Sequence, residues 1–228
     1  MKLFECFFWI EPKRVPTEQD LKPKVLWYYP KNVSAITKEF KDIPQFCFPD
    51  LEILRLEKAQ TARNEHFTFT LTDKYGRRYY GICMRALFRG MKRRHDVGRR
   101  YKHCLCFITT NPFFALFKTV LLELHAIALL HDQLSCRSFL EHISNLFSMD
   151  DGREYYTIPC SALPGILHRN LTFIAPKPGF GLNQILLLPL FDVLGIERFF
   201  KLFSAVLCER KIVFIADNVG TLSTTILG

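Results

Sequence analysis

The sequence predicts an α+β lobe, in which helices pack on an antiparallel sheet, followed by the start of an α/β lobe. Residues 67–85 alternate apolar and hydroxyl side chains around a turn, as in a β-hairpin. Two helical segments, 112–130 and 135–147, follow the predicted strands. A helical pattern at 196–208 then leads into residues 212–216, which are apolar at every position, as in a strand buried on both faces.

The elements of the first lobe follow from local signals. Pro30 ends an apolar run, and the prolines at both ends of 43–50 exclude a long regular element there. Asp73–Gly76 has turn chemistry, and Asn111–Pro112 supplies a cap and a first-turn proline for a helix. The expected strands are 3–10, 24–29, 67–71, 78–84 and 103–109.

The polar stretch 149–152 predicts a domain boundary, which gives two units, 1–149 and 150–228. In the second unit we expect a strand at 171–175 in addition to the helix and strand at 196–216. Few residues follow 212–216 to supply neighbouring strands. We therefore expect the second lobe to be truncated.

The composition is that of a globular protein whose basic charge is concentrated in one segment. The chain has 228 residues, of which 49% are hydrophobic and 23% charged. The net charge is +9, yet residues 74–103 contain eleven lysines and arginines and one acidic residue. Strong basic character therefore belongs to this segment rather than to the whole surface.

The cysteines and apolar segments indicate a cytoplasmic protein. Eight cysteines occur without a C-x-x-C pair, mostly in apolar runs, which favours buried free thiols in a reducing compartment. The apolar helix 112–130 contains Lys118 and Glu123, which argues against a membrane span. Residues 3–10 include Glu5 and lack a cleavage site, so we expect no signal peptide.

No motif indicates catalysis, a metal or a cofactor. Cys104 and Cys106 alternate on one strand next to His103, a pattern more typical of a protein core than of a four-ligand metal site. Cys160 and His168 lack a third orienting group, and the glycines at 179–181 lack the third glycine of a dinucleotide-binding turn. We therefore expect no cofactor and a protein that binds another macromolecule.

The basic loop that follows the hairpin has three interpretations. It could be a solvated loop without a partner, a contact for an anionic membrane surface, or a contact for an acidic protein or nucleic acid. Phe88 and Tyr101 are the only aromatic residues available to stack on bases, so no nucleic-acid partner is expected. The candidates for contact with an anionic surface are Arg85, Arg89, Lys92, Arg93, Arg94, Arg99 and Arg100.

Five segments together resemble the DENN-domain family, and two of them look most like its type-2 branch. Their order is that of the family's upstream module and the start of its central module. The segments are KLFECFFWI at 2–10, IPQFCFPD at 43–50, FTFTLTDKYGRRYYGICMR at 67–85, CLCFITTNPFFALFKTVL at 104–121 and LPLFDVLGIERFFKLFSAVLCERKIVFIADNVGTLSTTILG at 188–228.

The resemblance implies a longin-like first lobe, an α/β second lobe, and guanine-nucleotide exchange on a Rab-family small GTPase in vesicle trafficking. In such a mechanism the two lobes grip the GTPase, and preference for its nucleotide-free state releases GDP without covalent chemistry. The implied location is cytoplasmic and peripheral, on endosomal or other trafficking membranes. The short second lobe leaves open an incomplete or inactive form.

Two groups of residues are candidates for GTPase contact. One group follows the predicted strand 212–216, where partner sites of α/β sheets often lie, although these residues could instead cap a helix or lie free on the surface. The other lies in the proline-bounded loop, where core packing is the alternative. The candidates are Phe46, Phe48, Pro49, Asp217, Asn218, Thr221 and Ser223.

Three other functions remain open. The chain could be a non-catalytic module that binds a GTPase or a partner. It could activate GTP hydrolysis with Arg85 or Arg89, or act as a basic membrane or RNA adaptor through residues 85–102.

Overall fold

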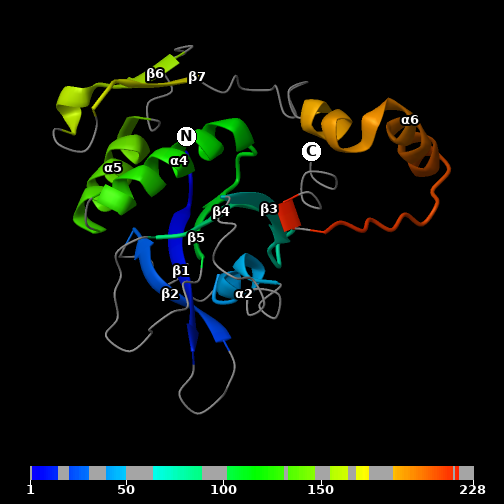
Figure 1. Ribbon diagram of the computed structural model, residues 1–228, viewed down its shortest axis with the longest axis horizontal. Helices are drawn as coiled ribbons and strands as arrows, with labels where there is room; N and C mark the ends of the chain where they lie inside the picture. Colours follow the sequence, from blue (N-terminus) through cyan, green and yellow to red (C-terminus); the bar gives the residue numbers. More distant parts are fainter. Residues whose placement is uncertain are drawn as a thin grey trace.

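Five strands of the described chain form one antiparallel sheet with the order β2-β1-β5-β4-β3 (Figure 1). They are β1 (Cys6–Arg14), β2 (Leu21–Tyr29), β3 (Glu65–Thr72), β4 (Arg78–Ala86) and β5 (His103–Thr109). The computed structural model describes residues 2–14, 21–30, 40–49, 64–88, 102–130, 133–146, 155–163, 168–174, 187–217 and 219–220.

The β3–β4 hairpin forms where the sequence predicts it. The Asp73 carboxylate accepts backbone N–H bonds from Tyr75 and Arg77, both at 2.8 Å. Gly76 closes the turn with φ +82°, a left-handed conformation that glycine adopts without steric cost. These bonds fix the register of the hairpin from Thr72 opposite Arg78 onward.

The central strand β5 pairs with β1 on one side and with β4 on the other. Phe107 lies opposite Phe7 in one ladder and opposite Ile82 in the other. Because side chains alternate along a strand, these three residues face one side of the sheet and Cys104 and Cys106 face the other. The sheet therefore buries two hydrophobic clusters, one on each face.

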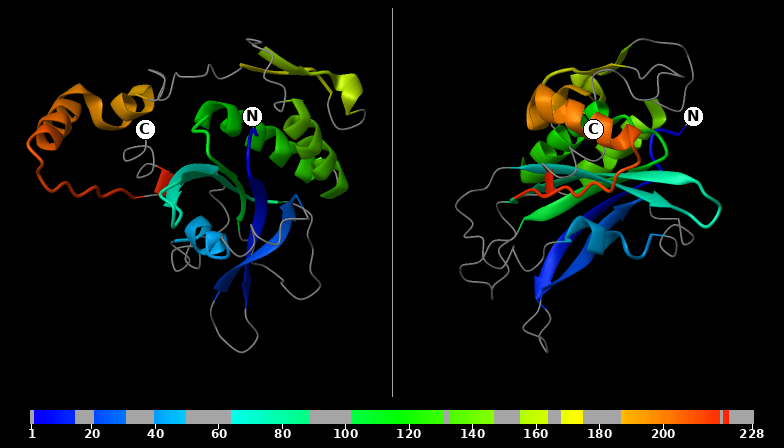
Figure 2. Two further views of the ribbon diagram at one scale, coloured as in Figure 1. Left: turned by 180° about the vertical axis from the view of Figure 1, so that it is seen from behind. Right: turned by 90° about the vertical axis from the view of Figure 1, so that its right-hand side faces the viewer.

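Helices α4 (Phe114–Leu130) and α5 (Gln133–Leu146) cover the face that carries Phe107 (Figures 1 and 2). The Phe117 ring of α4 contacts the Phe107 ring with centroids 5.0 Å apart. α4 starts two residues later than Pro112, because the Asn111 side chain does not cap it. Asn111 Nδ2 instead donates to the Lys2 carbonyl at 3.2 Å and so ties the N-terminal segment to the start of the helix.

The short helix α2 (Ile43–Cys47) lies on the opposite face of the sheet. It has five residues, in agreement with the prediction that the proline-bounded segment excludes a long element. Ile43, Cys47 and Phe48 are buried against the sheet in the second hydrophobic cluster. The first lobe thus has the α+β architecture expected of a longin-like lobe.

A second, two-stranded sheet packs beside the helical layer. It consists of β6 (Tyr155–Ile158) and β7 (Leu171–Ile174), with the 3-10 turn η1 (Cys160–Ala162) between them. Ile158 and Leu171 are buried in the same cluster as α4 and α5. Arg169 pairs with Glu123 of α4 at 3.0 Å. The sequence predicted β7 but not β6, and the division at residues 149–150 stays a prediction.

Helix α6 (Leu187–Leu207) bends at Gly195, where φ is +70°. Glu209 ends the helix in a left-handed conformation with φ 50°. The N–H groups of Glu209 and Arg210 then bond back to the carbonyls of Val206 and Ala205, as in a Schellman motif. No helix in the described part of the chain is long and apolar enough to cross a bilayer.

The prediction of a buried strand at 212–216 is wrong. This segment follows α6 as extended chain without strand pairing, and Val213 and Ile215 are 81% and 93% exposed (Figure 2). An apolar run becomes a buried strand only where neighbouring strands complete its hydrogen bonds. Among the described residues, no strand pairs with 212–216.

Candidate partner-binding surface

Helix α2 is held to the sheet by its buried side and presents its other side to solvent. Pro44 is compatible with the first turn of the helix, where no intrahelical N–H bond is needed. The buried Phe40 ring packs edge-on against Tyr79 of β4, with centroids 5.2 Å apart. The buried side of α2 therefore holds the helix in place on the sheet, and the other side is exposed to solvent.

Phe46 is an apolar side chain on this exposed side, with 44% of its surface accessible. It stacks on Phe69 of β3 with ring centroids 5.3 Å apart and an interplanar angle of 27°. The Phe69 ring in turn lies over Gly81 of β4, where any Cβ atom would collide with it. Gly81 thus creates the space that allows the two rings to form one apolar surface.

The chain after α6 returns to this region of the sheet. Val219 packs against the cluster that contains Cys47 and Phe48, and both figures place this segment beside β3 (Figures 1 and 2). Asp217, two residues earlier, is exposed. The two predicted groups of site residues therefore approach the same face of the sheet, although they come from opposite halves of the sequence.

The structure separates the predicted contact residues into accessible and buried ones. Phe46, Pro49 and Asp217 are exposed, and their role in partner binding stays a prediction. Phe48 is 2% exposed and packs in the core, so the prediction that it contacts a partner is wrong. Asn218, Thr221 and Ser223 lie outside the described residues. Sequence reasoning missed Phe69 and Val219. The sequence signal for Phe69 was Gly81, a glycine within a predicted strand, which leaves room for the Phe69 ring.

The prediction that Arg85 contacts an anionic surface, or reaches into a GTPase, is also wrong. Its side chain is 1% exposed, because β4 continues through Ala86 and directs Arg85 beneath α2. Arg85 Nε donates to the Cys47 carbonyl at 3.0 Å, and Nη1 lies 3.5 Å from Glu65. Its guanidinium also lies over the Phe67 ring, 4.8 Å from the centroid.

Glu65 forms ion pairs with two buried basic side chains. It pairs with Arg85 and also with Lys102, which is itself buried. The remaining basic-loop candidates, Arg89, Lys92, Arg93, Arg94, Arg99 and Arg100, lie outside the described residues.

Four buried cysteines share the hydrophobic cluster between α2 and the sheet. They are Cys47 at the end of α2, Cys83 of β4, and Cys104 and Cys106 of β5. Burial raises the pKa of Cys83, Cys104 and Cys106. Burial also opposes ionisation of Cys47, but hydrogen bonds from the other three thiols and the positive charge of Arg85 lower its pKa.

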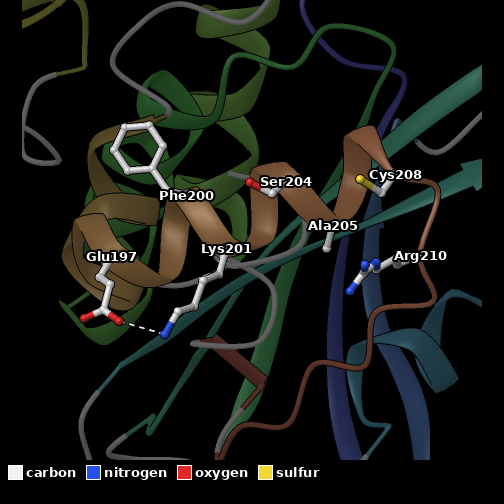
Figure 3. Close-up of a pocket in the computed structure, with 7 residues that line it drawn as sticks. All are labelled: Glu197, Phe200, Lys201, Ser204, Ala205, Cys208 and Arg210. Carbon is white, nitrogen blue, oxygen red and sulfur yellow. Dashed lines mark hydrogen bonds and ion pairs between the residues drawn. The ribbon is translucent and has the colours of Figure 1, made fainter.

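Helix α6 presents a second exposed apolar region. Phe200, Phe203 and Val206 each have at least half of their surface accessible. An open groove of about 570 Å³ lies between the helix and the chain that follows it (Figure 3). Its lining residues are Glu197, Phe200, Lys201, Ser204, Ala205, Cys208 and Arg210. Exposed apolar surface of this extent on a helix is typical of a segment that binds a macromolecule.

Two known domains match this chain. The uDENN domain matches residues 23–86, and the DENN (AEX-3) domain matches residues 100–228, which is more than half of the chain. This chain belongs to the DENN family. The two matches follow the order of modules that the sequence resemblance implied.

Several curated relatives carry type-2 DENN names. The chain is 28% identical to DENN domain-containing protein 2B of Homo sapiens over 98% of this chain and 19% of the relative. It is 27% identical to protein 2C of Mus musculus, covering 97% of this chain and 24% of the relative. The chain is 26% identical to protein 2D of Homo sapiens over 98% of this chain and 46% of the relative. The chain thus spans less than half the length of these relatives.

Proposed function

We propose that this chain takes part in guanine-nucleotide exchange on a Rab-family small GTPase. The observation that carries the proposal is the match of the DENN domain to residues 100–228, preceded in order by the uDENN match. An exchange factor acts by binding the nucleotide-free GTPase more tightly than the GDP-bound form. Such a protein needs an accessible binding surface rather than a nucleophile.

The structure offers an apolar surface suited to this task. Phe46 and Phe69 form a stacked pair on the α2 side of the sheet, with the exposed Pro49 close by in sequence. Aromatic side chains presented on a rigid base are the residues that most often dominate binding energy at interfaces. We place the GTPase contact at Phe46, Pro49 and Asp217, with Phe69 supporting Phe46.

A direct assay uses release of a fluorescent GDP analogue from a panel of Rab proteins. The purified chain is added to each loaded GTPase, and any longer protein that contains this sequence is run in parallel. Acceleration of release from at least one Rab supports the proposal. Absence of acceleration by both proteins across the panel would refute it.

The contact residues are tested in the same assay. Phe46→Ala should slow exchange by about 10-fold or more, because truncation of an interface aromatic commonly costs over 1 kcal/mol of binding energy. Tyr75→Ala is the matched control, since Tyr75 is an exposed aromatic residue at the tip of the β3–β4 hairpin. Equal effects of the two substitutions would place the contact elsewhere.

Binding without exchange is a second candidate function. The observation that favours it is the unpaired segment 212–217 together with the exposed face of α6, which leave much of the apolar surface of residues 196–215 uncovered. Rab binding that is equally tight in the GDP-bound and nucleotide-free states, with unchanged GDP release, would support this function.

We place the protein at the cytoplasmic surface of trafficking membranes, with the basic loop as the membrane contact. Vesicles that contain phosphatidylserine test this contact, because they attract the loop through its positive charge. Neutralising Lys92, Arg93 and Arg94 together should weaken vesicle binding, because each basic residue near the surface contributes about 1 kcal/mol. Unchanged sedimentation with the vesicles would remove the membrane contact.

A further inference from the structure

The four thiols beneath α2 come from three separate segments of the chain. Cys47 ends α2, Cys83 lies in β4, and Cys104 and Cys106 lie in β5. Cys83 and Cys106 are direct partners in the β4–β5 ladder. Cys104 and Cys106 are two residues apart on one strand and therefore point to the same face of the sheet. The fold thus brings four cysteines from three distant segments into one buried cluster.

The spacing of three of these sulfur atoms is close to that of metal ligands. Cys47 Sγ and Cys83 Sγ are 3.9 Å apart. The sulfur atoms of Cys47, Cys83 and Cys106 all lie within 4.8 Å of one another. Cys104 lies outside this group of three, but it is on the same face of β5 as Cys106 and belongs to the same buried cluster. Thiolates about 2.3 Å from a tetrahedral zinc ion stand roughly 3.8 Å apart.

The surroundings of the cluster suit a closed site. All four cysteines are fully buried, and the apolar side chains of Phe8, Ile10 and Ile43 belong to the same cluster. Four thiolates around a divalent cation carry a net charge of about −2. The buried guanidinium of Arg85 lies next to Cys47 and offsets part of that charge.

We propose that Cys47, Cys83, Cys104 and Cys106 bind one Zn²⁺ ion in a tetrahedral structural site that fastens α2 to β4 and β5. Each thiol that is protonated releases its proton to solvent as its sulfur binds the ion, and no electron is transferred. Four protein ligands leave no open position for substrate, so the site is structural rather than catalytic. This proposal revises the sequence-based expectation that the chain binds no metal.

Zinc would give α2 the support that its length cannot provide. A helix of five residues is too short to be stable by its own hydrogen bonds. Binding of Cys47 to an ion shared with three strand residues would fix the end of α2, next to the exposed Phe46. The site would therefore order the surface around Phe46, whatever partner that surface binds.

The test measures metal content and uses the full chain. The chain is produced in zinc-supplemented medium, purified by gel filtration, and analysed for metal by mass spectrometry, with an expected content of about one zinc ion per chain. Cys47→Ser and Cys106→Ser should reduce the zinc content to near zero. Cys136→Ser is the matched control, because Cys136 is equally buried but lies in α5 on the other face of the sheet. It should retain the ion.

A cobalt spectrum and a chelation experiment cover the case in which the serine variants fail to fold. Co²⁺ added to the zinc-free chain should give the ligand-field and sulfur-to-cobalt charge-transfer bands of tetrahedral thiolate binding. Chelation should lower the melting temperature of the unmodified chain, and Zn²⁺ should restore it. A folded chain that takes up neither ion, and melts at the same temperature with and without chelator, would overturn the proposal.

Zinc retained at about one ion per chain by a folded Cys47→Ser, Cys106→Ser double variant would also overturn it. None of these measurements uses a GTPase. Failure of the zinc site is therefore distinguishable from failure of the proposed exchange function.

Discussion

Glu65 illustrates how one residue of an edge strand controls a buried region. It pairs with Arg85 and Lys102, both of which the fold removes almost completely from water. Pairing offsets the desolvation cost of the two cations, so loss of the carboxylate should destabilise the fold. We expect Glu65→Gln to lower the free energy of unfolding by about 3 kcal/mol.

Urea unfolding followed by circular dichroism checks this value. Glu123→Gln is the control, because it removes a carboxylate whose partner, Arg169, is exposed. A surface pair of this kind is worth less than about 1 kcal/mol. Equal losses of unfolding free energy for the two variants would contradict the prediction that pairing with buried Arg85 and Lys102 makes Glu65 more stabilising than Glu123.

His66 should make the stability of the fold depend on pH. Burial, together with the positive charge of Lys118, lowers its pKa to about 4. Between this value and the ordinary value of about 6.5, the unfolded chain binds a proton that the folded chain does not. The contribution of neutral His66 to the free energy of unfolding is therefore fully present above about pH 6.5 and is lost as the pH falls toward 4.

The prediction is tested by urea unfolding at about pH 7.5 and about pH 5. The difference in unfolding free energy between the two conditions should be smaller for His66→Gln than for the unmodified chain. Burial also lowers the pKa of His125, but that residue is present in both proteins and so cancels from the comparison. His168→Gln, which replaces an exposed histidine, is measured alongside as the control. If His66→Gln leaves the difference unchanged, His66 is not the responsible group.

At the scale of single elements, α6 differs from the other long helices in what it buries. Phe200 and Phe203 of α6 are 59% and 50% exposed, whereas Phe117 of α4 is fully buried. We expect Phe200→Ser with Phe203→Ser to change the free energy of unfolding by less than about 0.5 kcal/mol, because little buried contact is lost. Phe117→Ser should cost about 3–5 kcal/mol, because it leaves a cavity in the core.

The same α6 variant should also associate less with itself, since its exposed apolar surface is smaller. Analytical ultracentrifugation over a range of concentrations measures this effect. A large loss of stability on changing the two α6 residues would show instead that they pack against the body of the protein.

The elements differ in how far the sequence could predict them. The β3–β4 hairpin was predictable because Asp73 and Gly76 fix the turn locally. Residues 212–216 were assigned wrongly, because hydropathy records apolar character but not whether a neighbouring strand is present. Strand β6 was missed because its four residues become a strand through pairing with β7, a contact that local pattern does not reveal.

At the scale of the whole molecule, stability should be greatest at the centre of the five-stranded sheet. β5 is bonded on both sides, by β1 and β4, and is covered on both faces. Hydrogen exchange followed by mass spectrometry should therefore find the slowest amides in β5 and the fastest described ones at 211–217, which lack strand partners. Protection of 211–217 equal to that of β5 would contradict the unpaired state of this segment.

The candidate surface was less predictable than the fold, because it depends on contacts between distant residues. Position next to a basic loop suggested that Arg85 was accessible, whereas the continuation of β4 buries it. The thiol cluster could not be predicted either, because it also depends on contacts between residues that are distant in the sequence. Cys104 and Cys106 were noted as neighbours, but Cys47 and Cys83 join them only through the folding of α2 over β4 and β5.

The strand order has a consequence for how this chain is made in a cell. β1 is synthesised about 100 residues before β5, yet its register places Phe7 opposite Phe107 of β5. At a synthesis rate of about 5–20 residues per second, β1 leaves the ribosome roughly 5–20 s before that partner exists. During this interval it can pair with β2 alone, and its other edge stays open. We expect chaperones to bind this open edge of the hairpin until β5 has been synthesised.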